Sequence, residues 1–186
     1  TKYMPYEDMQ YLKHLDNILD QTANSGNFKH TLKALLRASK LDAFAFYRQL
    51  TNWWVQAGHY PQSHNAKGVA AILLQFIEEN YCEKRAELLE ILRFDVFCDI
   101  PQWRPEWLEW NTEKIFETTS AFWRNEALVA QYIPEYKFSS WRQIHKFYPI
   151  ELFKADWQTG EQKNLYVMLD NKSKEKRLLV LPLEKN

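Results

Sequence analysis

The sequence predicts an α+β protein, with a mainly helical body of about six helices followed by a small three-stranded antiparallel sheet. Apolar residues recur at helical spacing up to residue 134 and alternate with other residues after it. Only 4 glycines and 7 prolines occur among 186 residues, so loops should be few. We therefore expect a single domain over residues 1–186, with a helical part at 1–134 and a β-rich part at 135–186.

Six stretches with apolar residues three or four positions apart predict the helices. Asp42 and either Ser63 or Asn65 are expected to cap the third and fourth of them, because short polar side chains are preferred at helix N-termini. Pro134 closes the last one. The predicted helices run from residue 6 to 23, around Phe28 to Leu36, from Asp42 towards Gly58, from Ser63 or Asn65 to Asn80, from about Glu83 to Phe97, and from Thr112 to about Tyr132.

Three β-prone runs follow the helices. The first comes directly after Pro149, which suits an edge strand because proline cannot donate to a sheet. The other two alternate apolar residues with other residues, as half-buried strands do. The runs contain Ile150, Leu152 and Phe153, then Leu165, Val167 and Leu169, and finally Leu178 and Val180. Together they predict a small antiparallel sheet within residues 145–184.

The charge balance disfavours a nucleic-acid partner. Lys and Arg together number 24, the same as Asp and Glu, so the chain lacks the basic excess that drives nonspecific binding to phosphates. Cys82 and Cys98 lie far apart, which indicates a reducing cytoplasm rather than a disulfide framework. We expect no membrane association, since the apolar runs are short. The start at Thr1 suits a segment of a longer polypeptide.

Aromatic residues make up 16 % of the chain and include 8 tryptophans. Most of them are expected in the core, and the alternative is a face that binds a partner. Trp103, Trp107 and Trp110 lie close together between Pro101 and the sixth helix. Trp107 and Trp110 are three positions apart, so one short helix would present both. Domain docking or core packing is the favoured role for this cluster, ahead of ring stacking with a ligand.

Few residues suggest chemistry. His59 and His64 flank a Tyr-Pro turn and would share a metal only with further ligands, so we favour surface histidines. Asp95 shares an apolar helical stripe with Leu88, Ile91 and Leu92, and a buried carboxylate needs a partner. We expect a structural aspartate held by Arg93, another arginine or the backbone; the alternatives are an acid with a shifted pKa and an interface contact. No phosphate loop or hydrolase motif supports catalysis.

Three landmarks carry a resemblance to a known family. They are Asn24-Ser25-Gly26 followed by Phe28, then Leu41-Asp42-Ala43-Phe44-Ala45-Phe46-Tyr47 leading to Trp53, Trp54 and Gly58, and finally Leu92-Arg93-Phe94-Asp95-Val96-Phe97. In this order and spacing they resemble the uncharacterised domain after the barrel of cobalamin-binding radical S-adenosylmethionine proteins. These proteins are often labelled as similar to anaerobic magnesium-protoporphyrin monomethyl ester cyclases.

The resemblance implies a non-catalytic C-terminal auxiliary domain that packs on or caps the radical barrel. The intact enzyme would use a four-iron (4Fe-4S) cluster, S-adenosylmethionine and cobalamin, and the partners would be the upstream barrel and cobalamin-binding domains. This chain departs from the family's catalytic part, since it lacks the CxxxCxxC run that holds the cluster and the Asp-x-His-x-x-Gly cobalt motif. The alternative hypothesis is a free-standing helical module that binds a protein or ligand through its tryptophan-rich surface.

Overall fold

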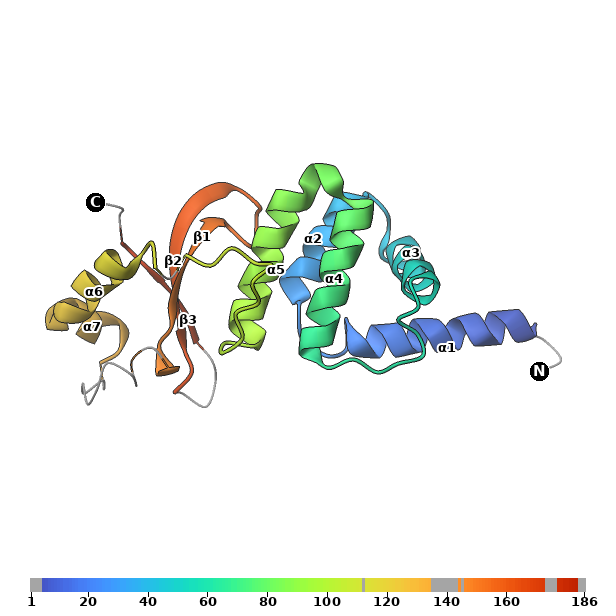
Figure 1. Ribbon diagram of the computed structural model, residues 1–186, viewed down its shortest axis with the longest axis horizontal. Helices are drawn as coiled ribbons and strands as arrows, with labels where there is room; N and C mark the ends of the chain where they lie inside the picture. Colours follow the sequence, from blue (N-terminus) through green and yellow to red (C-terminus); the bar gives the residue numbers. More distant parts are fainter. Residues whose placement is uncertain (1–4, 112, 135–143, 145, 173–176, 184–186) are drawn as a thin grey trace. The chain divides into compact units, whose positions relative to one another are not determined.

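The computed structural model describes residues 5–111, 113–134, 144, 146–172 and 177–183. The chain divides into two compact units, Thr1–Ile100 and Pro101–Asn186 (Figure 1). The predicted fold class is confirmed, because helices are followed by a three-stranded antiparallel sheet. The division between the units precedes the change from helix to strand, so the last two helices belong to the same unit as the sheet.

The first unit is helical throughout its described residues. Its elements are α1 (Tyr6–Gln21), α2 (Lys29–Ser39), α3 (Ala43–Gln56), α4 (Ala66–Asn80), the short 3-10 helix η1 (Cys82–Lys84) and α5 (Arg85–Asp99). The predicted caps are confirmed: the side chain of Asp42 accepts from the backbone N of Ala45 at 2.9 Å, and that of Asn65 from Gly68 at 3.0 Å. Asn65 rather than Ser63 is therefore the N-cap of α4.

Helix α5 packs against α2 and α4. Every residue from Ile91 to Phe97 is buried, including Arg93 and Asp95. The first unit buries apolar side chains of α2, α3, α4 and α5, among them Leu35, Phe46, Leu50, Trp54, Leu73, Phe76 and Leu92. Buried polar side chains need hydrogen-bond partners, so Arg93 and Asp95 must each bind another group of the protein.

Helix α1 is the least buried helix of the first unit. It packs against α3, and Ile18 is its one fully buried side chain. Near its start Tyr6 is 69 % exposed and Leu12 is 46 % exposed, although Leu12 belongs to the predicted apolar stripe. The stripe therefore correctly predicts a helix here but overstates how much of it is covered.

The second unit begins with turns and two helices, α6 (Phe116–Arg124) and α7 (Glu126–Tyr132). The prediction of one helix from Thr112 to Tyr132 is wrong, and Thr112 itself lies outside the described residues. The break is at Asn125, which leaves the helical conformation with φ −92° and ψ 88°. Its side chain accepts from the backbone N of Leu128, so Asn125 ends one helix and caps the next.

The sheet has the order β1-β2-β3, with β1 (Ile150–Ala155), β2 (Gln162–Asp170) and β3 (Arg177–Leu181). Both pairs are antiparallel, and Asp170 lies opposite Arg177 at the end of the second pair. Central strand β2 is buried from Leu165 to Asp170. One face of the sheet forms a core with α6 and α7 that includes Phe122, Trp123, Ile133, Tyr148, Leu152 and Met168. The ends of the predicted sheet at residues 145 and 184 lie outside the described residues.

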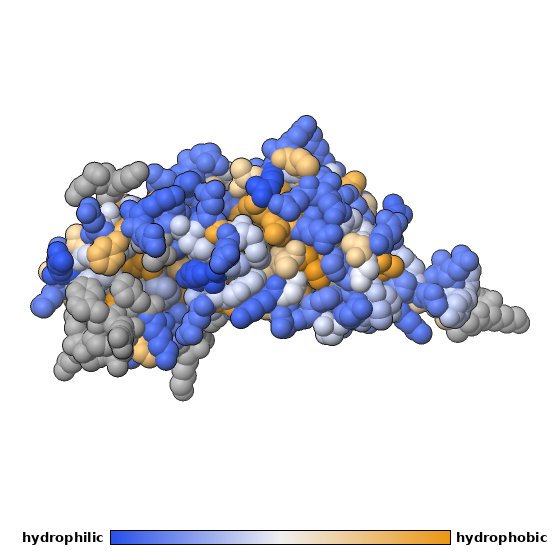
Figure 2. Space-filling model, in the orientation of Figure 1, coloured by the Kyte–Doolittle hydropathy of each residue, from blue (hydrophilic) through white to orange (hydrophobic). Residues whose placement is uncertain are grey.

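Figure 2 shows hydrophilic residues over most of the visible face, with apolar residues between them. Among the described residues, no helix is both long and apolar enough to cross a membrane.

Candidate functional site

The landmark residue Asp95 of α5 meets two residues of α2 in a buried polar cluster. Asp95 Oδ2 accepts from the backbone N and from the hydroxyl of Thr31, each at 2.7 Å. Its other oxygen, Oδ1, lies 2.7 Å from Nδ1 of His30, whose side chain is 18 % exposed. Asp95 itself is 1 % exposed. A buried carboxylate with three polar contacts has the partners that its burial requires.

This arrangement caps α2 from a neighbouring helix. The N-cap residue Phe28 provides no side-chain cap and has a left-handed backbone with φ 55°. Asp99 accepts from the backbone N of Phe28 at 2.8 Å, and Asp95 accepts from that of Thr31. Asp95 and Asp99 are four residues apart and so share one face of α5. Two carboxylates at the N-terminus of α2 also suit the positive end of the helix dipole.

The turn before α2 contains the first landmark, Asn24-Ser25-Gly26. Helix α1 ends at Gln21, and Gly26 adopts φ 76°, a conformation that glycine takes without steric cost. Within the turn, the hydroxyl of Ser25 donates to the carbonyl of Thr22 at 2.8 Å, and the Asn24 amide donates to Asp20 at the same distance. Asn24, Ser25 and Gly26 therefore fix the path by which the chain enters α2.

The expected partner of Asp95 is only half right. The backbone does bind it, but its partners are Thr31 and His30 and not an arginine. Arg93 pairs with Glu90 one turn earlier, with Nη2 to Oε1 at 2.6 Å and Nε to Oε2 at 3.0 Å. Residues two apart point to different sides of a helix, which is why Arg93 does not reach Asp95.

The tryptophan cluster does not form the expected short helix. The chain makes turns there, and the rings of Trp103 and Trp107 meet edge to face, with centroids 5.7 Å apart. Trp110 is held differently: its Nε1 donates to the carbonyl of Pro105 at 3.0 Å, and the guanidinium of Arg104 lies 4.3 Å from its ring centroid. Trp107 and Trp110 thus have separate roles despite their spacing.

Asn111, just after this cluster, forms hydrogen bonds with the sheet of its own unit. The buried carboxylate of Glu151 on β1 accepts from the backbone N of Asn111 at 2.9 Å. The Asn111 side chain donates to the carbonyl of Leu152 at the same distance. Two hydrogen bonds therefore attach the C-terminal end of the tryptophan-containing segment to β1.

The histidine pair of the first unit is engaged in structural bonds. His59 Nε2 lies 3.0 Å from Oε1 of Gln75, and His64 Nε2 lies 2.9 Å from the carbonyl of His59. The centroids of the two imidazole rings are 6.0 Å apart. No group of three or more potential metal ligands is found among the described residues.

A neighbouring contact couples Trp53 to an exposed carboxylate. Trp53 Nε1 donates to Oε2 of Glu79 at 2.7 Å, and Gln75 donates to Oε1 at 2.8 Å. The bond from Trp53, aided by that from Gln75, lowers the pKa of Glu79. The contact fixes Trp53 of α3 against α4.

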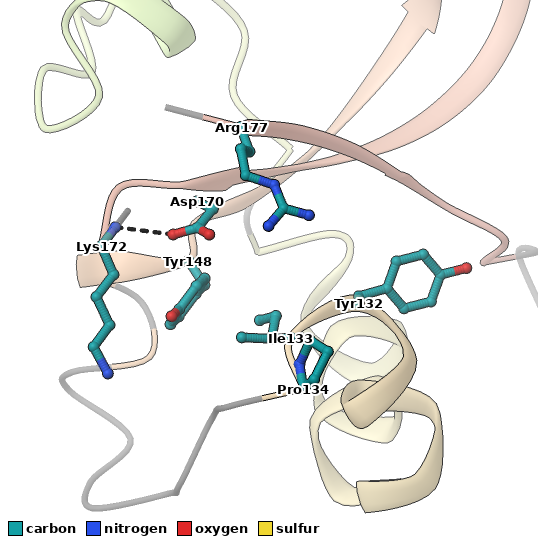
Figure 3. Close-up of a pocket in the computed structure, with 7 residues that line it drawn as sticks. All are labelled: Tyr132, Ile133, Pro134, Tyr148, Asp170, Lys172 and Arg177. Atoms are coloured by element: carbon teal, nitrogen blue, oxygen red, sulfur yellow. Dashed lines mark hydrogen bonds between the residues drawn. The ribbon is translucent and has the colours of Figure 1, made fainter. Parts of the chain in front are cut away.

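The strongest candidate for a ligand site is a cavity of about 470 Å³ in the second unit (Figure 3). It lies where the end of α7 approaches the end of the β2–β3 pair. None of its residues was expected as a site from the sequence. It is lined by Tyr132, Ile133, Pro134, Tyr148, Asp170, Lys172 and Arg177.

Charges and apolar groups line opposite sides of this cavity. Asp170 is 7 % exposed, and its Oδ1 accepts from the backbone N of Lys172 at 2.9 Å. Figure 3 shows the Arg177 guanidinium directed into the space between Asp170 and Ile133. Across from it, Tyr148 and Ile133 are 3 % and 7 % exposed and form an apolar wall with Pro134.

Sequence reasoning missed the cavity and the role of His30. His30 and Asp95 are 65 residues apart, and Tyr132, Asp170 and Arg177 come from separate elements. No spacing rule connects such residues before the fold is known. The one usable signal was the buried position of Asp95 on the α5 stripe, which required partners from elsewhere.

Residues 1–175 match the family described as a protein of unknown function (DUF4080). The match spans both units and all three landmarks. No curated protein and no solved structure matches the chain. The chain therefore belongs to this family.

Proposed function

We propose that this chain, as a member of the DUF4080 family, is a non-catalytic auxiliary domain of a cobalamin-binding radical S-adenosylmethionine enzyme. In the intact polypeptide it would follow the radical barrel and pack on it or cap it. The proposal rests on the sequence landmarks. The observation that best supports a non-catalytic role is that landmark residues make structural hydrogen bonds. The landmark residues Phe28 and Asp95 take part in bonds that hold α2 to α5, so both have a structural role.

The residues of this chain do not fit the cofactors of the proposed enzyme. A four-iron cluster in that family needs three thiolates at CxxxCxxC spacing, and the chain has Cys82 and Cys98 alone. Cys82 is the first residue of η1 and donates to the carbonyl of Glu78, whereas Cys98 is part of α5. Cluster, S-adenosylmethionine and cobalamin would therefore bind to the upstream domains. Neither Cys82 nor Cys98 is in a disulfide within the described structure, which also suits the proposed cytoplasmic location.

The first test is the coding region upstream of Thr1. The proposal requires a barrel with a CxxxCxxC run there, preceded by a cobalamin-binding domain. An upstream region without such a run would contradict the proposal directly.

The second test compares the intact polypeptide with one that ends just before Thr1. Both forms are purified anaerobically, and their iron content and S-adenosylmethionine cleavage are measured. If the domain is auxiliary, the shortened form keeps its iron and still cleaves S-adenosylmethionine without substrate. Loss of iron in a folded, soluble shortened form would show that this chain helps to build the cluster site.

The alternative function is a free-standing binding module that uses the tryptophan cluster. It is favoured by one observation: Trp103 and Trp107 are half-buried and meet edge to face, so part of each ring stays accessible. The upstream region separates the two hypotheses, since a free-standing module needs no barrel. Trp103→Ala with Trp107→Ala would weaken partner binding under this alternative.

A further inference from the structure

The geometry of the cavity in the second unit points to a binding site for a small organic carboxylate. This inference does not depend on the proposed function. At about 470 Å³, the cavity falls within the range of about 300–1,000 Å³ typical of small-molecule sites. Such sites combine an apolar lining with a few polar groups that orient the ligand, and this cavity has both.

Arg177 is the group best placed to hold the carboxylate. It lies opposite Asp170 in the strand register, but no ion pair joins the two within the described residues. Figure 3 shows its guanidinium directed into the cavity. A guanidinium presents parallel N–H groups that match the two oxygens of a carboxylate, so Arg177 can bind it in a bidentate manner.

The remaining charges favour an anion over a cation. Among the described residues of the lining, Lys172 and Arg177 are basic and Asp170 is acidic. The carboxylate of Asp170 is buried and already accepts from the backbone N of Lys172, so it holds the turn after β2 in place. The net charge of these three side chains is therefore positive, which attracts a carboxylate to the cavity.

The apolar wall defines the rest of the ligand. Ile133, Pro134 and the ring of Tyr148 face the cavity across from Arg177. They offer no ionised group, so burying an apolar group of the ligand against them is favourable. A ligand that uses both sides has a carboxylate at one end and a compact ring or branched chain at the other.

The experiment uses benzoate as the probe and calorimetric titration of the whole chain at fixed ionic strength. Benzyl alcohol keeps the ring without the charge, and inorganic phosphate keeps the charge without the ring. We expect one benzoate per chain with a Kd of about 1 mM or below, and at least tenfold weaker binding of the other two probes. Failure of benzoate to saturate the chain, or equal binding of phosphate, would overturn the inference.

Arg177→Gln is the decisive variant, and Lys163→Gln is its matched control. Arg177 is exposed, so its replacement should leave the urea midpoint of the chain unchanged. Lys163 is an exposed cation on β2 that does not line the cavity. We expect Arg177→Gln to weaken benzoate binding at least tenfold and Lys163→Gln to leave it unchanged. Equal binding by Arg177→Gln and the unchanged chain would show that the cavity is not the site.

Discussion

Asp95 of α5 binds Thr31 of α2 twice, through the backbone N and the hydroxyl, with both donors 2.7 Å from the same carboxylate oxygen. The two residues are 64 positions apart in the sequence, and both are buried. One bond supplies an acceptor for a backbone N–H in the first turn of α2, which has no partner within the helix. The other gives the buried hydroxyl of Thr31 an acceptor. The carboxylate of Asp95 therefore helps to fix the position of α2 on α5.

Thr31→Val should lower the free energy of unfolding by about 1 kcal/mol. Valine keeps the shape of threonine but removes the hydroxyl, while the backbone bond to Asp95 remains. Urea unfolding of the chain measures the change. Thr118→Val on α6 is the control, since the hydroxyl of the half-buried Thr118 makes no bond in the described structure. Equal effects of the two variants would mean that the Thr31 hydroxyl contributes nothing specific.

Asn125→Ala should destabilise the second unit by about 1 kcal/mol, because alanine cannot accept the bond from the backbone N of Leu128. Gln131→Ala, at an exposed position of the same helix α7, is the control and should have little effect. Thermal unfolding followed by circular dichroism compares the two variants. An unchanged midpoint for Asn125→Ala would contradict the capping role assigned to its side chain.

The stability of the chain should fall at alkaline pH. Burial raises the pKa of Tyr47 and of Tyr81, so the folded state keeps protons that the unfolded state releases above pH about 10. Their contribution is complete below that pH and is lost as the pH rises through the folded-state pKa values. Urea midpoints measured from about pH 8, below the unfolded-state pKa of tyrosine, to about pH 11, above it, follow this loss.

Replacing both tyrosines by phenylalanine isolates their share of the alkaline loss. The hydroxyl of Tyr81 is buried without a partner among the described atoms, so Tyr81→Phe should not lower stability at neutral pH. The double variant Tyr47→Phe, Tyr81→Phe should lose less stability between neutral and alkaline pH than the unchanged chain. An equal loss in both proteins would assign the effect to other groups.

The purified chain should contain no stoichiometric iron or cobalt. Its two cysteines are sixteen positions apart and lie in different elements, so they cannot provide the three thiolates of a cluster. Elemental analysis after anaerobic reconstitution with iron and sulfide tests this point. About four iron atoms per chain, which a four-iron cluster requires, would contradict the assignment of the cluster to upstream domains.

Local signals in the sequence correctly predicted local structure. Asp42 and Asn65 cap helices as expected, and the alternation of Leu165, Val167 and Leu169 lies in a strand. These features depend on neighbours within one turn or one strand, which the sequence displays directly. The break at Asn125 was missed because apolar spacing continues through it, with no glycine or proline to mark the change.

Partners distant in sequence could not be predicted in the same way. The stripe on α5 showed that Asp95 is buried, but the identity of its partners depended on how α2 lies against α5. Arg93 was the nearest candidate in sequence and binds Glu90 instead. The cavity was also out of reach, since Ile133 and Arg177 come together only through the packing of α7 near the sheet.

The most direct test of the structural role of the landmarks is the urea midpoint of Asp95→Asn, with Asp16→Asn as control. Asparagine keeps one acceptor but places an NH2 group among donors, and Asp16 is an exposed aspartate of α1. We predict that Asp95→Asn lowers the free energy of unfolding by about 3 kcal/mol and that Asp16→Asn has little effect. An unchanged midpoint for Asp95→Asn would contradict the claim that the Asp95 carboxylate stabilises the fold.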